Sequence, residues 1–193
     1  STQSRSSAAS DVYKRQYISG ISGDYLFHSV PYYSMSEEDL ELEEFNKLGE
    51  QASQGCVRLA VSDAKWVYDN CPTGTNVSIY DDAENAGPLG KPDAIKITDF
   101  TNKWDPTDSN KKCPYAKATP IISGANDYTI KSGGEFYALA GVTAVDTCGN
   151  DITSNIEVFG NVVTTRKGKY KVTYSVTDVL KRTSSVTITV TVQ

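Results

Sequence analysis

The chain has 193 residues, with 24 acidic and 19 basic side chains and a net charge of −5. This acidic balance without a basic stripe argues against a nucleic-acid partner, and no stretch approaches the roughly 18 consecutive apolar residues that a membrane helix needs. One histidine and four scattered cysteines exclude zinc-finger and zinc-ribbon ligand sets, and the length suits one or two domains.

Residues 1–16 are rich in Ser, Ala, Arg and Gln and show no apolar period. We therefore predict that they are disordered and not native to the fold. They also lack the apolar core of a signal peptide.

Residues 17–80 carry sequence patterns of strands and helices in alternation. A strand is predicted over 24–29, and a strongly acidic helix over 36–45 with Ser36 as its N-cap, because acidic residues fill its first turn. A second helix is predicted over 61–70 with Ser62 as its N-cap, and a strand over 76–80. The candidates for buried contacts on the second helix are Ala64, Trp66, Val67 and Tyr68.

Residues 81–120 are poor in apolar side chains and hold five of the seven prolines. This composition is typical of a connector that is semi-rigid where proline is dense. We predict a short strand over 94–97, contact of Trp104 with the first domain, and a linker over 106–120.

From residue 121 to the end, short β-branched and aromatic runs alternate with polar residues and are separated by glycine turns. Period two is the signature of half-buried antiparallel strands. The predicted strands cover 127–131, 137–145, 156–163, 170–176 and 186–192, which together indicate a β-sandwich.

This segment, 121–193, resembles the bacterial immunoglobulin-like modules of Gram-positive surface proteins. The residues that carry the resemblance include the runs 139–144 and 151–153, Gly168-Lys169-Tyr170, and the run 172–178. Such modules serve as spacers, adhesins and wall-binding units, so the resemblance predicts a fold and leaves the ligand open.

Cys56 follows a glycine in a loop that leads toward a helix, and His28 is the only imidazole in the chain. A thiol becomes a good nucleophile when a nearby base takes its proton, so the two form a candidate nucleophile–base pair. From the residues alone, a buried structural Cys56 with a surface or hydrogen-bonded His28 stays open as the alternative, and free cysteines are often buried.

The segment also resembles the C-terminal half of the L,D-transpeptidase catalytic domain, a family that cross-links peptidoglycan. The motif reads His28-Ser29-Val30-Pro31, followed by Ser53-Gln54-Gly55-Cys56-Val57-Arg58. Many members carry His where Gln54 stands, and here the gap between His28 and Cys56 is longer than usual. The acidic stretch 36–44 fills that gap, either as an inserted helix over the groove or as a solvated face.

The resemblance implies a role for each matching residue. Cys56 would be the nucleophile, His28 the general base, and Ser29 would orient His28 through its backbone carbonyl. Gly55 and Cys56 amides would form the oxyanion hole, while Ser53 shapes the loop. Arg58 would hold the loop or a substrate carboxylate, and Tyr25, Tyr32 and Tyr33 are lid or groove candidates. No metal or organic cofactor is needed.

The sequence thus predicts a mainly β chain with one or two helices: a truncated L,D-transpeptidase catalytic domain over 17–105 and an Ig-like β-sandwich over 121–193. Its predicted function is peptidoglycan acyl transfer through a Cys56 thioester, at the cell wall of a Gram-positive bacterium. The expected partners are stem peptides, with a surface polymer or protein for the Ig-like domain.

Two alternatives stay open. One is a non-catalytic surface module with a remnant catalytic half. The other is a cysteine peptidase, although papain-like peptidases place the cysteine before the histidine. Outside the cell a disulfide such as Cys71–Cys113 is an open prediction, and Cys148 completes the set of cysteines.

Overall fold

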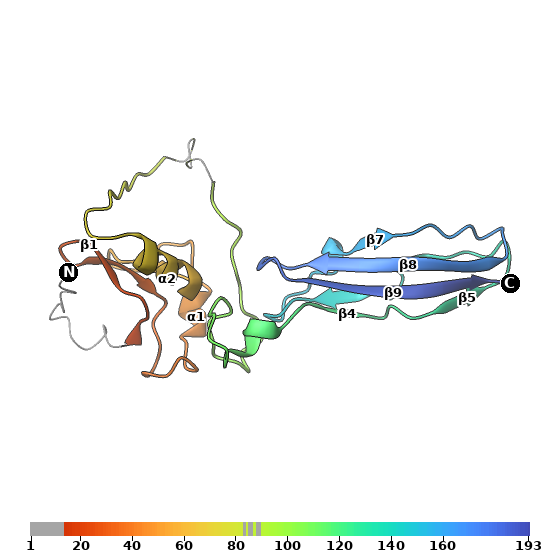
Figure 1. Cartoon of the computed structure of the whole chain (residues 1–193), viewed down its shortest axis with the longest axis horizontal. Coiled ribbons are helices and arrows are strands. Elements are labelled where there is room, and N and C mark those ends of the chain that lie inside the picture. The colour runs from red at the N-terminus through yellow and green to blue at the C-terminus, as the bar shows by residue number, and fades with distance from the viewer. Residues whose placement is uncertain (1–13, 83, 85–86, 88–89) are drawn as a thin grey trace. The chain divides into compact units, whose positions relative to one another are not determined.

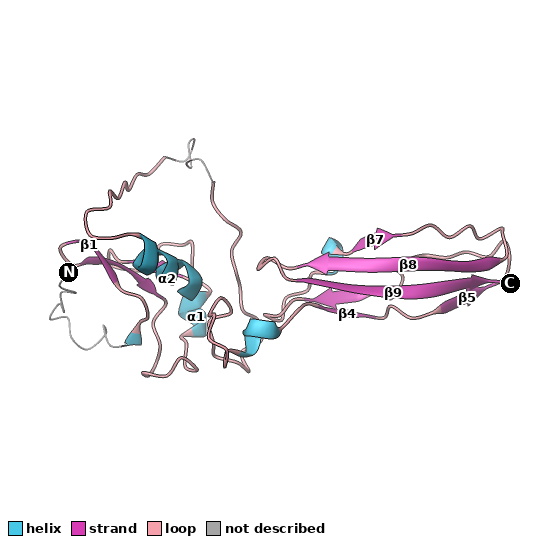
Figure 2. Cartoon of the chain, viewed as in Figure 1, coloured by secondary structure: helices cyan, strands magenta, loops and turns pink. Residues whose placement is uncertain are grey.

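The computed structural model describes residues 14–82, 84, 87 and 90–193. The chain divides into two compact units, Ser1–Ala116 and Lys117–Gln193. Figure 2 shows more strand than helix among the described residues, and the longest helix lies in the first unit. The predicted mainly β fold class is confirmed.

Three short strands form the sheet of the first unit, in the order β1-β2-β3 (Figure 1). β1 (Ser19–Ser22) pairs antiparallel with β2 (Tyr25–Ser29), and β2 pairs in parallel with β3 (Val57–Leu59). The strand predicted over 24–29 is confirmed. Because β2 and β3 are parallel, the chain between them returns to the starting end of β2 before β3 begins. That return brings the segment around residue 56 next to β2.

α2 (Val61–Asn70) follows β3, and the helix predicted over 61–70 is confirmed. The predicted N-cap is wrong, because Ala60 occupies that position and has no side chain that could cap. Another segment supplies the acceptors: Asp105 Oδ2 accepts the Val61 N–H at 2.9 Å, and Thr107 Oγ1 accepts that of Ser62 at 3.0 Å. The first turn of α2 is thus capped from outside the helix.

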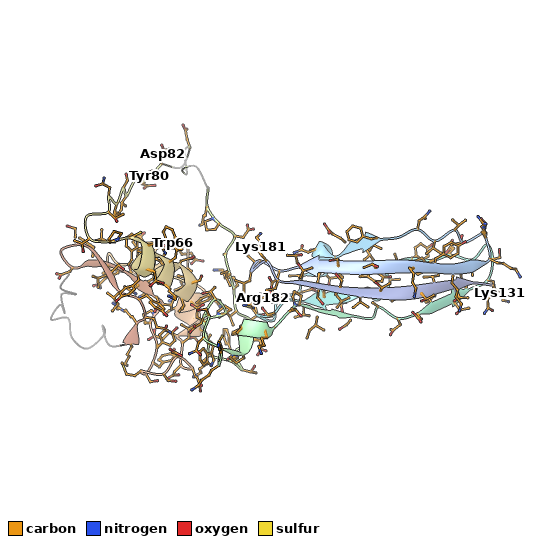
Figure 3. All side chains as sticks on the ribbon, in the orientation of Figure 1. Trp66, Tyr80, Asp82, Lys131, Lys181 and Arg182 are labelled. Carbon is orange, nitrogen blue, oxygen red and sulfur yellow. The ribbon has the colours of Figure 1, made fainter. Side chains whose placement is uncertain are left out.

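The prediction that Trp66 and Tyr68 are buried on α2 is also wrong. Trp66 is 61% exposed and Tyr68 43%, whereas Ala64 is fully buried. Trp66 lies two residues after Ala64, about 200° around the helix axis, so it faces away from the buried side. Figure 3 labels Trp66 on α2. Tyr68 packs edge-on against Tyr17, with ring centroids 6.0 Å apart.

The acidic helix predicted over 36–45 is much shorter in the structure. α1 spans Leu42–Phe45, and Glu41 is its N-cap without a side-chain hydrogen bond. Ser36 instead accepts the Glu38 N–H within a turn, and Leu40 forms an isolated bridge with Tyr32. Burial explains the change, because Leu40, Leu42 and Phe45 all point into the core and fix an extended entry to the helix.

The prediction of disorder over 1–16 fails at its end; residues 1–13 lie outside the described residues. The backbone of Gln16 exchanges hydrogen bonds with Ser29, donating to Ser29 Oγ at 2.8 Å and accepting the Ser29 N–H at 3.0 Å. The Tyr32 N–H donates to the Lys14 carbonyl at 2.8 Å. Residues 14–16 are therefore tied to the end of β2.

Neither of the strands predicted over 76–80 and 94–97 is formed in the described residues. The backbone of Ile97 is instead held by the Asn46 side chain, which donates to the Ile97 carbonyl at 2.8 Å and accepts the Ile97 N–H at 2.7 Å. Much of the stretch predicted as a linker over 106–120 packs in the first unit, where Cys113 and Tyr115 are buried, and Trp104 just before it is buried too. A 3-10 helix, η2 (Pro114–Lys117), lies at the division between the units.

The second unit holds two sheets. β5 (Tyr128–Ile130), β9 (Thr183–Val192), β8 (Gly168–Thr177) and β7 (Glu157–Phe159) form one sheet in that order, and β4 (Ile121–Ser123) pairs with β6 (Thr143–Val145) in the other. The 3-10 helix η3 (Thr153–Asn155) precedes β7. The long antiparallel β8–β9 pair is the centre of the larger sheet (Figure 2).

The alternation predicted for the last two strands is confirmed: their inward residues are buried. These residues are Val172, Tyr174 and Val176 on β8 and Ile188, Val190 and Val192 on β9. The strands predicted over 137–145 and 156–163 are shorter than expected, because turns with glycines at positive φ, Gly141 and Gly160, interrupt them.

The described residues, which include all four cysteines, contain no disulfide, so the Cys71–Cys113 bridge is not formed. In the same part of the chain no helix combines the length and the apolar character that crossing a membrane requires.

Candidate active site

A cavity of about 890 Å³ lies in the first unit, lined by β2, β3, the loop before β3 and the segment before β1. It brings together most of the side chains that the motif singled out. Its lining residues are Arg15, Asp24, Tyr25, His28, Gln51, Ala52, Ser53, Gln54, Gly55, Cys56 and Arg58.

The pairing of β2 with β3 explains why these residues meet. His28 and Arg58 are register partners in the parallel pair, and partners in neighbouring strands project from the same face of a sheet. Cys56 stands two residues before Arg58, which is the period that returns a side chain to that face. Residues far apart in the chain therefore open into one cavity.

His28 is 1% exposed, and its Nδ1 lies 2.6 Å from the Ser29 carbonyl oxygen. A carbonyl can only accept, so Nδ1 carries the proton and Nε2 holds the lone pair. Nε2 is buried and has no hydrogen-bond partner among the described residues. Burial lowers the pKa of His28 to about 4, although the Ser29 contact opposes this, and the positive charges of Arg15 and Arg58 lower it further. The ring is neutral at physiological pH.

Cys56 is half-buried, and its Sγ lies 3.9 Å from the Asp24 carbonyl oxygen. In the resting structure the thiol therefore points toward a backbone acceptor. Since His28 Nε2 has no partner among the described residues, the two reactive atoms share the cavity without a hydrogen bond between them. Apo active sites are often loose in this way.

The loop that carries Cys56 is braced by Ser53 and Gly55. Ser53 Oγ donates to the Cys56 carbonyl at 2.5 Å and accepts the Gly55 N–H at 3.2 Å. The Gly55 amide, which the resemblance assigns to the oxyanion hole, is thus engaged at rest. Gly55 has a φ of +142°, and a Cβ there would stand 2.3 Å from Cε1 of Tyr25. Glycine is required by both the backbone conformation and the close aromatic ring.

Arg58 forms an ion pair with Glu44 through Nη1 and Oε2. The side chains are 20% and 25% exposed, so the pair is largely shielded from water. Hydrogen bonds from Lys47 and then from Arg58 hold the pKa of the Glu44 carboxyl below its usual value. A residue of the acidic segment therefore contacts the cavity wall.

Tyr32 and Tyr33 do not line this cavity. Tyr32 is buried, accepts a hydrogen bond from Gln16 Nε2 at 2.9 Å, and has its pKa raised chiefly by burial. Tyr33 is exposed and donates to Glu43 at 3.3 Å. Tyr25, by contrast, does line the cavity.

Sequence reasoning missed Arg15, Asp24, Gln51, Ala52 and Glu44. Arg15 stands in a segment expected to be disordered, yet it lines the cavity with its Nε buried and unpartnered among the described residues. Gln51 and Ala52 adjoin the motif, so loop proximity was an available signal for them. No spacing rule pairs Glu44 with Arg58. Within the described residues, the cavity included, no cluster of three or more His, Cys, Asp or Glu side chains could hold a metal ion.

Two family models match the chain. Residues 4–79 match the L,D-transpeptidase catalytic domain, YkuD, and residues 120–192 match the Ig-like domain of bacterial surface proteins. The first match begins within the segment that we expected to lie outside the fold.

One curated relative is "Putative L,D-transpeptidase YciB" of Bacillus subtilis (strain 168), 49% identical over 57 residues. The match covers 30% of this chain and 28% of that protein, so the chain spans under a third of the relative.

Among solved structures, the chain is similar to "CBM51-2 in complex with GlcNAc and INT domains" from Clostridium perfringens ZmpB. That match has 31% identity and a TM-score of 0.35, and covers 38% of this chain and 16% of that one. A second similar structure is the lipoprotein BT2262 of Bacteroides thetaiotaomicron, at 22% identity and a TM-score of 0.32, covering 38% of this chain and 37% of that one.

The chain thus combines, in this order, a segment that matches the L,D-transpeptidase catalytic domain family and a segment that matches the bacterial surface Ig-like family.

Proposed function

We propose that the protein is a peptidoglycan L,D-transpeptidase that transfers an acyl group from a stem peptide to an amine through a Cys56 thioester. The observation that carries the proposal is the shared cavity: Cys56, a neutral His28 with its Nε2 unpartnered among the described residues, and Arg58 all line it. The family match over 4–79 supplies the reaction class.

In the first half-reaction, the thiol turns from the Asp24 carbonyl toward His28 Nε2, which takes the Cys56 proton. The thiolate attacks the donor carbonyl, and the Cys56 amide stabilises the oxyanion, because the Gly55 amide is already donated to Ser53. Collapse forms the thioester and breaks the peptide bond. His28 returns its proton to the departing amine.

In the second half-reaction, His28 takes a proton from the acceptor amine as it attacks the thioester carbonyl. The new amide forms, the carbon–sulfur bond breaks, and the proton passes to Cys56 as its thiol. Ser29 keeps Nε2 basic throughout, because its carbonyl holds the Nδ1 proton. With water as the acceptor the same residues would act as a peptidase, and the family match favours the amine.

For the second unit we propose a role as a module at the bacterial surface, outside the cell, that holds a polymer or protein of the wall. The match to the surface Ig-like family over 120–192 supports this location. We assign the catalytic segment to 17–105, together with residues 14–16 and the part of the expected linker that packs in the same unit, and the Ig-like domain to 121–193. If Cys56 proves inert, this module is the alternative function of the chain.

The test is intact-mass measurement of the full chain after incubation with a carbapenem, a β-lactam class that acylates the cysteine of this family. We expect a single adduct that disappears in Cys56→Ala and persists in Cys71→Ala, a matched control since both thiols are half-buried. Absence of an adduct in protein with a native circular dichroism spectrum would overturn the proposed acyl transfer.

A further inference from the structure

The acidic segment between His28 and Cys56 is held to the core by buried side chains and hydrogen bonds, whereas a purely solvated segment would have neither. Phe45 is fully buried, and Asn46 exchanges two hydrogen bonds with the backbone of Ile97. Lys96 additionally donates to the Asn46 carbonyl. Glu44 stands directly before these two anchoring residues, so its backbone cannot drift relative to the core.

Among the described contacts of this segment, the Glu44 carboxylate is the acidic group that pairs with a side chain of the cavity lining. It pairs with Arg58, whereas the neighbouring Glu43 accepts from the exposed Tyr33. Arg58 in turn is the register partner of His28 on β2–β3 and lines the cavity. A rigid carboxylate thus holds a long, otherwise flexible side chain beside the candidate base.

We propose that Glu44 is a positioning residue, which fixes the Arg58 guanidinium at the cavity wall so that its remaining N–H groups can bind an anionic group of the acyl donor. This inference rests on the proposed function. It also gives a reason for the long gap between His28 and Cys56, because the segment that fills the gap contributes Glu44. Arg58 has five N–H donors, so the Glu44 contact leaves capacity for a ligand.

The first test measures acylation of Cys56 by a carbapenem, a carboxylate-bearing donor, in wild type, Glu44→Gln, Arg58→Met and the double variant. We expect Glu44→Gln to lower the second-order rate about tenfold, mainly through weaker binding. In the Arg58→Met background the same change should have almost no further effect, because the residue that Glu44 positions is gone. Additive losses would overturn the proposal, since a purely structural Glu44 would act equally in both backgrounds.

Glu43→Gln is the matched control, because it removes the adjacent carboxylate, which contacts Tyr33 rather than Arg58. It should leave the rate within twofold of wild type. Equal losses in Glu43→Gln and Glu44→Gln would also overturn the proposal, since the loss would then follow negative charge in general.

A second readout does not need activity, and so separates this inference from the proposed function. His28 is the only histidine, so its ring signals in an NMR titration are unambiguous. The titratable and charged side chains that share its cavity are those of Arg15, Asp24, Tyr25, Cys56 and Arg58. In Glu44→Gln the Arg58 charge is no longer balanced, and the His28 titration midpoint should fall; in Arg58→Met it should rise.

These two shifts are expected even if wild type forms no adduct, in which case only the proposed acyl transfer fails. An unchanged His28 midpoint in both variants would show that the pair does not act on the cavity and would overturn the positioning role.

Discussion

His28 combines near-complete burial with a fixed tautomer, and the two effects serve different ends. The Ser29 carbonyl decides which ring nitrogen is basic, while burial and the charges of Arg15 and Arg58 keep the ring neutral. The ring is therefore free to accept a proton over a wide pH range, while its lowered pKa makes it a weaker base than an exposed imidazole.

The lowered pKa of His28 predicts how the stability of the first unit depends on pH. The unfolded ring titrates near 6.5 and the folded ring at about 4, so the unfolded state binds more protons between these values. The contribution of His28 to the free energy of unfolding should therefore fall as pH drops from 6.5 to 4, by up to about 1.4 kcal/mol per pH unit.

Urea unfolding followed by tryptophan fluorescence measures this contribution, because both tryptophans, Trp66 and Trp104, lie in the first unit. His28→Gln should remove it. A variant with the same pH slope as wild type would contradict the assignment.

The single residues of the motif could be predicted in part from the sequence. The adjacency of Gly55 to Cys56 and of Ser29 to His28 is local, so a sequence pattern carries it. The Glu44–Arg58 pair depends on how the return segment packs on Phe45 and Asn46, which no local pattern encodes.

At the scale of elements, α2 depends on a cap that lies far away in the sequence. Asp105 is fully buried. One of its carboxylate oxygens accepts the Val61 N–H, and the other accepts the N–H and the hydroxyl of Thr107. The helix bounds were predictable from its own residues. The cap was not, because it comes from a segment whose composition resembles a linker.

Asp105→Ala should lower the free energy of unfolding of the first unit by about 1–3 kcal/mol, because a buried helix N–H loses its acceptor. Asp99→Ala is the matched control. Asp99 makes the same pair of hydrogen bonds, to Thr101, but on the surface, so its loss should cost no more than about 0.5 kcal/mol. Urea unfolding by tryptophan fluorescence compares them, and equal costs would refute the capping role.

The same variant has a pH signature. Burial raises the pKa of Asp105 to about 6, so its contribution to stability is present below the usual value of 3.8 and lost as pH rises through 6. This trend opposes that of His28 between pH 4 and 6. Asp105→Ala should therefore show a steeper gain in stability with rising pH than wild type does.

At the scale of the whole chain, each unit has its own buried residues. The core of the second unit consists of Val142, Ala144, Ile156, Val172, Tyr174, Val176, Ile188 and Val190. Alternation along β8 and β9 made much of this core predictable, because period two is a strong signal. The smaller sheet of the first unit was predictable only strand by strand, since parallel pairing joins segments with no shared turn.

Ile188→Ala should destabilise the second unit by about 2–5 kcal/mol, because it leaves a cavity at a site that is 5% exposed. The tryptophan transition should not move, since both tryptophans belong to the other unit. Far-UV circular dichroism in urea would report the lost strands. Ile121→Ala, at a position 66% exposed, is the control and should shift neither signal; a tryptophan transition that moves with Ile188→Ala would contradict separate unfolding.

The parallel pairing of β2 with β3 does not fix the length of the chain that joins them. Register between His28 and Arg58 is set by the strands, so exposed positions of the return segment can be changed or extended while its buried residues, Leu40, Leu42 and Phe45, keep it packed. For protein engineering these exposed positions are sites for insertion. A graft that keeps the turn from Glu44 to Asn46 would alter what the cavity admits while leaving the chemistry in place.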